Sequence, residues 1–282
     1  MALLPLAFVV GCWLVGNDLI APAHRSVGLS PSDFPTVEVS FPSKSGAAIS
    51  AWYAPVEHAV ATIVLLHPIR ADRRSMLGRA KLLRELGYST LLVDLQSHGE
   101  SIGDRITFGD LERHDAAAAI EFVRSRTPQH RIGVVGCSLG GAAALLASPL
   151  DIDALVLESV YPHIVGAVHN RVAMRLGPLH HVFAPALLVQ LKPRLAISPS
   201  QLRPVDHIGT ADCPVLVAAG DRDLHTTLGE SMALFQAANE PKRLVVFPDA
   251  AHEDLLQQNP QRYQEEIVPF LDLHLRPTDV SE

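Results

Sequence analysis

The stretch Ile132-Gly133-Val134-Val135-Gly136-Cys137-Ser138-Leu139-Gly140-Gly141 decides the fold of this chain. An apolar segment typical of a buried strand runs into Gly-x-Ser-x-Gly, and an alanine-rich segment typical of a helix continues to Ala147. In this strand, turn and helix order the serine occupies a strained turn that exposes its hydroxyl above the sheet edge. Glycines are needed at 136 and 140 because a side chain there would collide where the strand and helix pack. We therefore predict that Ser138 is a nucleophile.

Two further predicted strands are followed by loops that carry acids and a histidine. Residues 215–219 run into Gly220-Asp221-Arg222-Asp223, and residues 244–247 run into a loop that reaches His252. A serine hydroxyl is a poor nucleophile, so a histidine must take its proton and a carboxylate must orient the histidine. The order serine, acid, histidine is the one expected when the three residues follow successive strands of this kind of sheet. The sequence therefore predicts a catalytic triad.

Strand-like and helix-like segments alternate along most of the chain. The predicted strands are residues 37–41, 48–53, 63–66, 90–94, 132–135, 154–157, 215–219 and 244–247. Helical periodicity appears over residues 76–86 and 111–123. This alternation predicts an α/β fold with a mostly parallel sheet of about eight strands covered by helices on both faces. Between residues 160 and 210 the alternation breaks, which predicts an insertion.

The motifs resemble those of the α/β-hydrolase superfamily. Within it the chain is similar to serine esterases and to serine aminopeptidase and prolyl-oligopeptidase-type hydrolases, over about residues 36–276. The matching motifs are Gly136-Cys137-Ser138-Leu139-Gly140-Gly141, Asp94-Leu95-Gln96-Ser97-His98-Gly99-Glu100-Ser101, Gly220-Asp221-Arg222-Asp223 and Ala251-His252. The resemblance implies that the insertion, residues 160–210, is a small helical cap that selects the substrate.

The resemblance also assigns the acid of the triad. In the family's Gly-x-x-Asp pattern the second acid is the triad member, which is Asp223 here, with Asp221 as its rival. Asp249 is expected to be a turn residue before the histidine loop. The implied triad is Ser138, Asp223 and His252.

The oxyanion hole is the place where the chain departs from the family. By position, the resemblance implies that the N–H groups of Ile69 and Leu139 hold the oxyanion. The family usually has glycine after the histidine of its third strand, whereas Pro68 follows His67 here. Proline has no N–H and a fixed φ, so it cannot donate, and it either stiffens the hole or changes its opening. His67 and His98 are expected to be structural.

Composition excludes several classes of function. The net charge is −7, and the sequence contains no cluster of Lys and Arg, which argues against binding to nucleic acid. With 48% hydrophobic residues, the 282-residue chain can bury a large core. Its three cysteines show no spacing typical of a disulfide framework. The histidines of the insertion lack the spacing of metal ligands, so we expect no metal and no cofactor.

The N-terminus is the second informative region. Residues 2–16 are apolar and uncharged, interrupted only by Pro5, which is short for a membrane span and suited to a signal sequence. Ala21-Pro22-Ala23 resembles a cleavage site, although no Lys or Arg precedes the apolar run. We expect residues 1–23 to be a signal or membrane anchor outside the hydrolase core, and residues 24–35 to be a linker. The protein is then membrane-associated or exported rather than cytoplasmic.

These features together predict a serine hydrolase that cleaves small carboxylic esters through an acyl-enzyme. A first alternative is a serine peptidase of aminopeptidase type that acts on short peptides. Such an enzyme normally needs acidic residues for the substrate amine, and the insertion contains no identifiable cluster of them. A second alternative is a catalytically silent, membrane-tethered scaffold, although such proteins typically lose a member of the triad. Ser138 disfavours the hydrolases that use an aspartate nucleophile.

Overall fold

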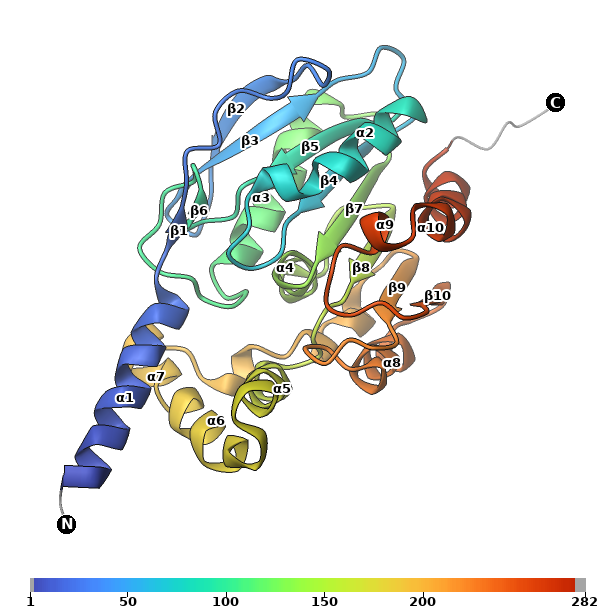
Figure 1. The fold of residues 1–282 in the computed structure, drawn as a ribbon. Helices are drawn as coiled ribbons and strands as arrows, with labels where there is room; N and C mark the ends of the chain where they lie inside the picture. The colour runs from blue at the N-terminus through green and yellow to red at the C-terminus, as the bar shows by residue number, and fades with distance from the viewer. Residues whose placement is uncertain (1–2, 277–282) are drawn as a thin grey trace.

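An eight-stranded sheet lies at the centre of the computed structural model, which describes residues 3–276 (Figure 1). The strand order is β10-β9-β8-β7-β4-β5-β3-β2, and all neighbours are parallel except the pairs β2–β3 and β3–β5. The strands are β2 (Val37–Pro42), β3 (Ala48–Ala54), β4 (Thr62–Leu66), β5 (Ser89–Val93), β7 (Ile132–Cys137), β8 (Ala154–Glu158), β9 (Val215–Gly220) and β10 (Lys242–Phe247). The predicted, mostly parallel sheet is confirmed.

Helices cover both faces of the sheet because the central strands are apolar on both sides. In β4, alternate residues contribute to different apolar clusters: Val64 and Leu66 to one, Ile63 and Leu65 to the other. The first cluster is closed by α3 (Glu112–Arg126), α4 (Leu139–Ala147) and α8 (Leu228–Ala237). The second is closed by α2 (Leu77–Glu85), α9 (Leu255–Gln258) and α10 (Pro260–Leu275).

The predicted insertion is helical, as expected of a cap. It contains α5 (Ile164–Leu176), α6 (His180–Leu188) and α7 (Leu191–Leu195), followed by three short 3₁₀ turns. Gly177, at φ +52°, and Pro178 separate α5 from α6, since neither residue continues a helix easily. The chain therefore turns back at this point, and α5 and α6 pack against each other as a hairpin.

The N-terminal segment makes extensive contacts with the rest of the chain. Helix α1 (Leu3–Ile20) packs beside α6, and β1 (Ala23–His24) pairs with β6 (His98–Gly99) (Figure 1). Residues 24–35, expected as a linker, contain two buried side chains, Val27 and Phe34, that pack into the second apolar cluster. Their proline and serine content predicted a linker, but the burial of Val27 and Phe34 depends on contacts with distant residues.

One stretch of the described residues is long and apolar enough to cross a membrane by length and composition. This stretch, Ile164–Leu195, comprises the cap helices, and 17% of its most apolar window is buried. In α1, the stretch Leu6–Ile20 falls into the class of shorter apolar helices. The same test is met by core helices of soluble proteins and by signal sequences, so it does not by itself identify an anchor.

The close approach of α4 to β4 gives a stability prediction. A Cβ on Gly140 would lie 2.4 Å from the carbonyl oxygen of Leu66, whereas a Cβ on Gly229 in α8 would meet nothing within 4 Å. Gly140→Ala should therefore lower the free energy of unfolding by about 2 kcal/mol or more. Gly229→Ala should be neutral or stabilise by up to about 1 kcal/mol, because alanine favours helix. Denaturant titrations of both variants measure this difference, and equal effects would contradict the proposed crowding.

Candidate active site

Ser138 lies at the sharp turn between β7 and α4. Its backbone has φ +47° and ψ −107°, a conformation that non-glycine residues rarely adopt and that costs about 1–3 kcal/mol. Two features allow the turn. Gly136 has no Cβ, and a Cβ there would lie only 2.5 Å from Cα of Gly141. The Ser138 backbone N–H also donates to the Glu158 carbonyl at 2.8 Å. The structure thus holds the predicted nucleophile in the strained turn that its motif requires.

Asp223 and His252 form a direct pair. Asp223 Oδ2 lies 2.7 Å from His252 Nδ1, while Asp223 Oδ1 accepts the N–H groups of His225 and Thr226. Burial, the largest influence, raises the pKa of Asp223, but the hydrogen bond and charge of His252 and the two amide donors outweigh it and lower that pKa. An ionised carboxylate only accepts, so Nδ1 carries the hydrogen and Nε2 is free to act as a base.

The three predicted triad residues lie at one edge of the sheet. Ser138 follows β7, Asp223 follows β9 and His252 follows β10, and these strands run in the same direction. The Ser138 hydroxyl is buried, and no hydrogen bond in the described part of the chain joins it to His252. Catalytic hydrogen bonds of unliganded enzymes often tighten only when substrate binds.

Asp221 and Asp249 support the turn that leads to the histidine. Asp221 Oδ1 accepts the Asp249 N–H at 2.8 Å, and Asp249 has φ +62°, which is typical of a turn position. Both side chains are exposed, and Asp249 forms an ion pair with Arg222. Asp223 rather than Asp221 contacts His252.

The two predicted oxyanion donors follow the neighbouring strands β4 and β7. Leu139 is the first residue of α4, so its N–H belongs to the amides that have no partner inside the helix. Ile69 follows β4, the strand that pairs with β7 on one side. Both residues pack against the same apolar cluster.

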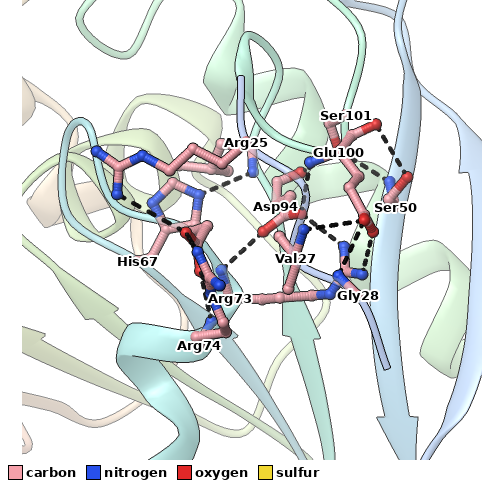
Figure 2. Close-up of polar contacts among 12 residues, drawn as sticks. Arg25, Val27, Gly28, Ser50, His67, Arg73, Arg74, Asp94, Glu100 and Ser101 are labelled. Carbon is pink, nitrogen blue, oxygen red and sulfur yellow. Dashed lines mark hydrogen bonds and ion pairs between the residues drawn. The ribbon is translucent and has the colours of Figure 1, made fainter. Parts of the chain in front are cut away.

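The loop that carries Ile69 is held by a buried arginine (Figure 2). The Arg73 guanidinium donates to Asp94 Oδ2 at 2.6 Å and also to Glu100, while the Arg73 N–H donates to Asp94 Oδ1 at 2.7 Å. Glu100 Oε1 in turn accepts the N–H groups of Val27 and Gly28 at 3.0 and 3.1 Å. The network therefore joins the loop after β4, the end of β5 and the N-terminal segment.

His67 and His98 are buried in this region, as structural residues would be. His67 Nδ1 donates to the Pro68 carbonyl at 2.8 Å, and its Nε2 accepts the Leu95 N–H at 3.1 Å, so the ring is neutral. Desolvation lowers the pKa of His67 to about 4. Desolvation, followed by the repulsion that a protonated His67 would exert, lowers the pKa of His98 to about 4 as well. His67 thereby fixes the carbonyl of the proline that departs from the family pattern.

A second arginine network, which the sequence analysis missed, lies beneath the nucleophile. Arg79 of α2 donates to Glu158 Oε1 at 3.0 Å and to Asp254 Oδ2 at 2.9 Å, and the Tyr263 hydroxyl donates to Glu158 Oε1 at 2.7 Å. Glu158 is the residue whose carbonyl receives the Ser138 N–H, and Asp254 lies two residues after His252. The only signal in the sequence was Glu158 itself, an acid that ends an otherwise apolar strand.

Several histidines lie close together in the cap. The rings of His169 and His180 are 5.5 Å apart, and those of His180 and His181 are 3.9 Å apart. Across residues 3–276, however, no group of three or more His, Cys, Asp or Glu side chains is arranged to hold a metal ion.

Comparison with known proteins identifies the class. The chain matches the model of the alpha/beta hydrolase family over residues 63–266. It is 32% identical over 226 residues to the uncharacterized protein Rv2307c of Mycobacterium tuberculosis, which covers 77% of this chain and 72% of that protein. It is 26% identical over 274 residues to the uncharacterized protein YfhR of Escherichia coli, covering 93% of this chain and 88% of that protein.

Solved structures show the same fold. The Pyrococcus furiosus esterase Pf2001 superposes with a TM-score of 0.75 at 20% identity, covering 91% of this chain and 98% of that chain. An esterase from Exiguobacterium antarcticum superposes with a TM-score of 0.62 at 15% identity, covering 84% and 100%. The chain therefore belongs to the alpha/beta hydrolase family and is a hydrolase.

The buried neutral histidines make stability sensitive to acid. The pKa of His98 falls from 6.5 to about 4 in the folded state, so between these values the unfolded chain binds a proton that the folded chain does not. The free energy of unfolding should thus decrease as pH falls through this window, by about 1.4 kcal/mol per unit for each such histidine. His98→Gln should reduce the dependence of the free energy of unfolding on pH, whereas His58→Gln, at an exposed site, should leave it unchanged. Denaturant titrations between pH 7 and pH 4 measure the slopes, and equal slopes for His98→Gln and wild type would contradict this origin.

Proposed function

We propose that the protein is a serine hydrolase that cleaves carboxylic esters through an acyl-enzyme. The observation that carries this proposal is the Asp223–His252 pair, which lies at the same sheet edge as a serine in a strained turn. Membership of the alpha/beta hydrolase family and the fold shared with two proteins named esterases support it.

The proposed mechanism assigns a role to each residue of the candidate site. Ser138 Oγ attacks the ester carbonyl while His252 Nε2 takes its proton, and Asp223 stabilises the imidazolium that forms. The N–H groups of Ile69 and Leu139 donate to the oxyanion of the tetrahedral intermediate. His252 then gives the proton to the leaving alcohol, and the acyl group stays on Ser138. Water attacks this acyl-enzyme, with His252 as the base, and releases the acid.

The scarcity of acidic residues in the cap favours ester substrates over peptides with a free amine. Asp206 is the only Asp or Glu among residues 160–210, and its carboxylate is exposed and bonded to Arg203 at 2.6 Å. The cap therefore offers no unpaired carboxylate to a substrate ammonium group. A silent scaffold is disfavoured because the chain retains the serine, the acid and the histidine.

The first experiment tests the nucleophile and the reaction class together. The full-length protein should hydrolyse p-nitrophenyl esters of graded acyl length faster than aminoacyl arylamides, and a fluorophosphonate probe should label Ser138. Ser138→Ala should abolish labelling and lower kcat by about 10³-fold or more. Faster turnover of the arylamides would favour the peptidase. Undiminished labelling of Ser138→Ala would show that Ser138 is not the nucleophile.

A matched pair of variants distinguishes between the two candidate acids of the triad. Asp223→Asn should lower kcat by about 10³-fold or more, because an amide at this position favours the wrong tautomer of His252. Asp221→Asn keeps an acceptor for the Asp249 N–H and should change kcat far less. Steady-state kinetics on one ester measures both variants, and the reverse ranking would contradict the assigned acid.

A further inference from the structure

Residues 6–16 of helix α1 are apolar on every side of the helix, yet protein covers them only in part. Its buried positions include Cys12 and Gly16, which lie four residues apart on one face. Its exposed large apolar side chains are Leu6, Val9, Val10, Trp13, Leu14 and Val15. A helix that is hydrophobic all round belongs in an apolar environment. The protein supplies this environment on one narrow face only.

The contact between α1 and the cap resembles helix packing inside a membrane. A Cβ on Gly16 would lie 2.3 Å from Gln190 Oε1, so the helices approach closely at a small residue. Gln190 Nε2 donates to the Cys12 carbonyl at 3.0 Å, and the Phe8 and Phe183 rings are 5.0 Å apart. Small residues at the crossing and hydrogen bonds between helices hold helices together in lipid.

An arginine completes this contact near the end of α1. The Arg194 guanidinium lies 3.7 Å from the centre of the Trp13 ring and donates to the Trp13 carbonyl and the Asn17 side chain. Helix α1 therefore lies beside α6 and α7 from Phe8 to Asn17 (Figure 1). If α1 enters an apolar environment, the parts of α6 and α7 that pack against it therefore enter the same environment.

The cap, whose helix α6 packs against α1, also exposes large apolar side chains. On α5, α6 and the turns beside them these are Val165, Met174, Leu176, Leu179, Val182 and Val189. A small apolar pocket, partly open to solvent, lies between α1 and the cap and is lined by residues such as Leu19, Val168 and Leu187. Exposed large apolar side chains this numerous on α1 and on the cap helices exceed the scattered single residues that are ordinary at a protein surface, and such exposure marks an interaction site.

The charge of the cap indicates which partner this surface fits. Residues 164–195 contain Arg171, Arg175, Lys192 and Arg194 and no Asp or Glu, although the whole chain has a net charge of −7. Arg175 and Lys192 are exposed. Exposed apolar side chains interspersed with cations are typical of segments that bind at the surface of anionic membranes.

We propose that α1 and the cap helices form one lipid-binding surface that inserts together into a bilayer containing anionic phospholipid. The apolar side chains of both parts enter the acyl region, and Arg175 and Lys192 contact headgroup phosphates. This extends the prediction of an N-terminal anchor, because the cap is inserted along with α1. It does not depend on the proposed ester hydrolysis.

Binding of the full-length protein to vesicles, measured by flotation, tests the proposal. The vesicles contain phosphatidylcholine alone or with phosphatidylglycerol. The cap variant Leu179→Glu/Val182→Glu, which leaves α1 intact, should bind about tenfold or more weakly to both kinds of vesicle. Arg175→Gln/Lys192→Gln should lose more affinity for the vesicles with phosphatidylglycerol, which carry net negative charge, than for those of phosphatidylcholine alone.

A control variant places a glutamate at an exposed apolar position outside α1 and the cap. Leu273 in α10 is 71% exposed, more than Leu179 and Val182 at 55% each, and Leu273→Glu should bind vesicles as wild type does. Thermal unfolding of every variant should remain close to wild type because the changed side chains are exposed. Wild-type binding by Leu179→Glu/Val182→Glu would show that α1 acts alone and would overturn the proposal. A full-length protein that ignores vesicles and forms a dimer dispersed by these variants would overturn it in favour of a second copy of the chain.

Discussion

The strained backbone of Ser138 is the constraint on which the site depends. A serine with positive φ raises the energy of the chain, and the surroundings must hold it there. The structure does so by close packing of α4 on β7 and β4, which glycines at 136, 140 and 141 permit. The Glu158 carbonyl adds a hydrogen bond to the Ser138 N–H from the neighbouring strand. The turn is thus a product of the whole centre of the sheet.

Two buried arginines connect this centre to the loops of the site. Arg79 binds Glu158 below the serine and Asp254 beside the histidine loop. Arg73 binds Asp94 and Glu100 and so holds the loop that leads from β4. Removal of one partner from a buried ion pair costs about 3–5 kcal/mol, because the remaining charge is left without compensation. Both networks therefore favour a single arrangement of the loops around Ser138.

The N-terminal helix is connected to the same loops. Arg70, the residue after Ile69, donates to the Asp18 carbonyl at the end of α1, and the Ile106 N–H donates to the Ile20 carbonyl. The cap contacts α1 on the other side through Gln190 and Arg194. Consequently, the loop after β4, the cap and the apolar N-terminal helix form one packed assembly.

The sequence by itself determined the α/β class, the mostly parallel sheet, the position of the insertion and the order of the candidate triad, and the family resemblance implied that the insertion is helical. Local sequence patterns predict these features: apolar strands, helical periodicity and a Gly-x-Ser-x-Gly turn. The roles of Ser138, Ile69 and Leu139 stay predictions, and the contact between Asp223 and His252 gives the acid its partner. Only the tertiary structure decided the rest. Arg79 and Glu158 are 79 residues apart, and Gln190 and Cys12 are 178 apart, so no local pattern could reveal that they meet. The same holds for Val27 and Phe34, because burial by distant residues, and not local composition, decides whether such a segment is a free linker.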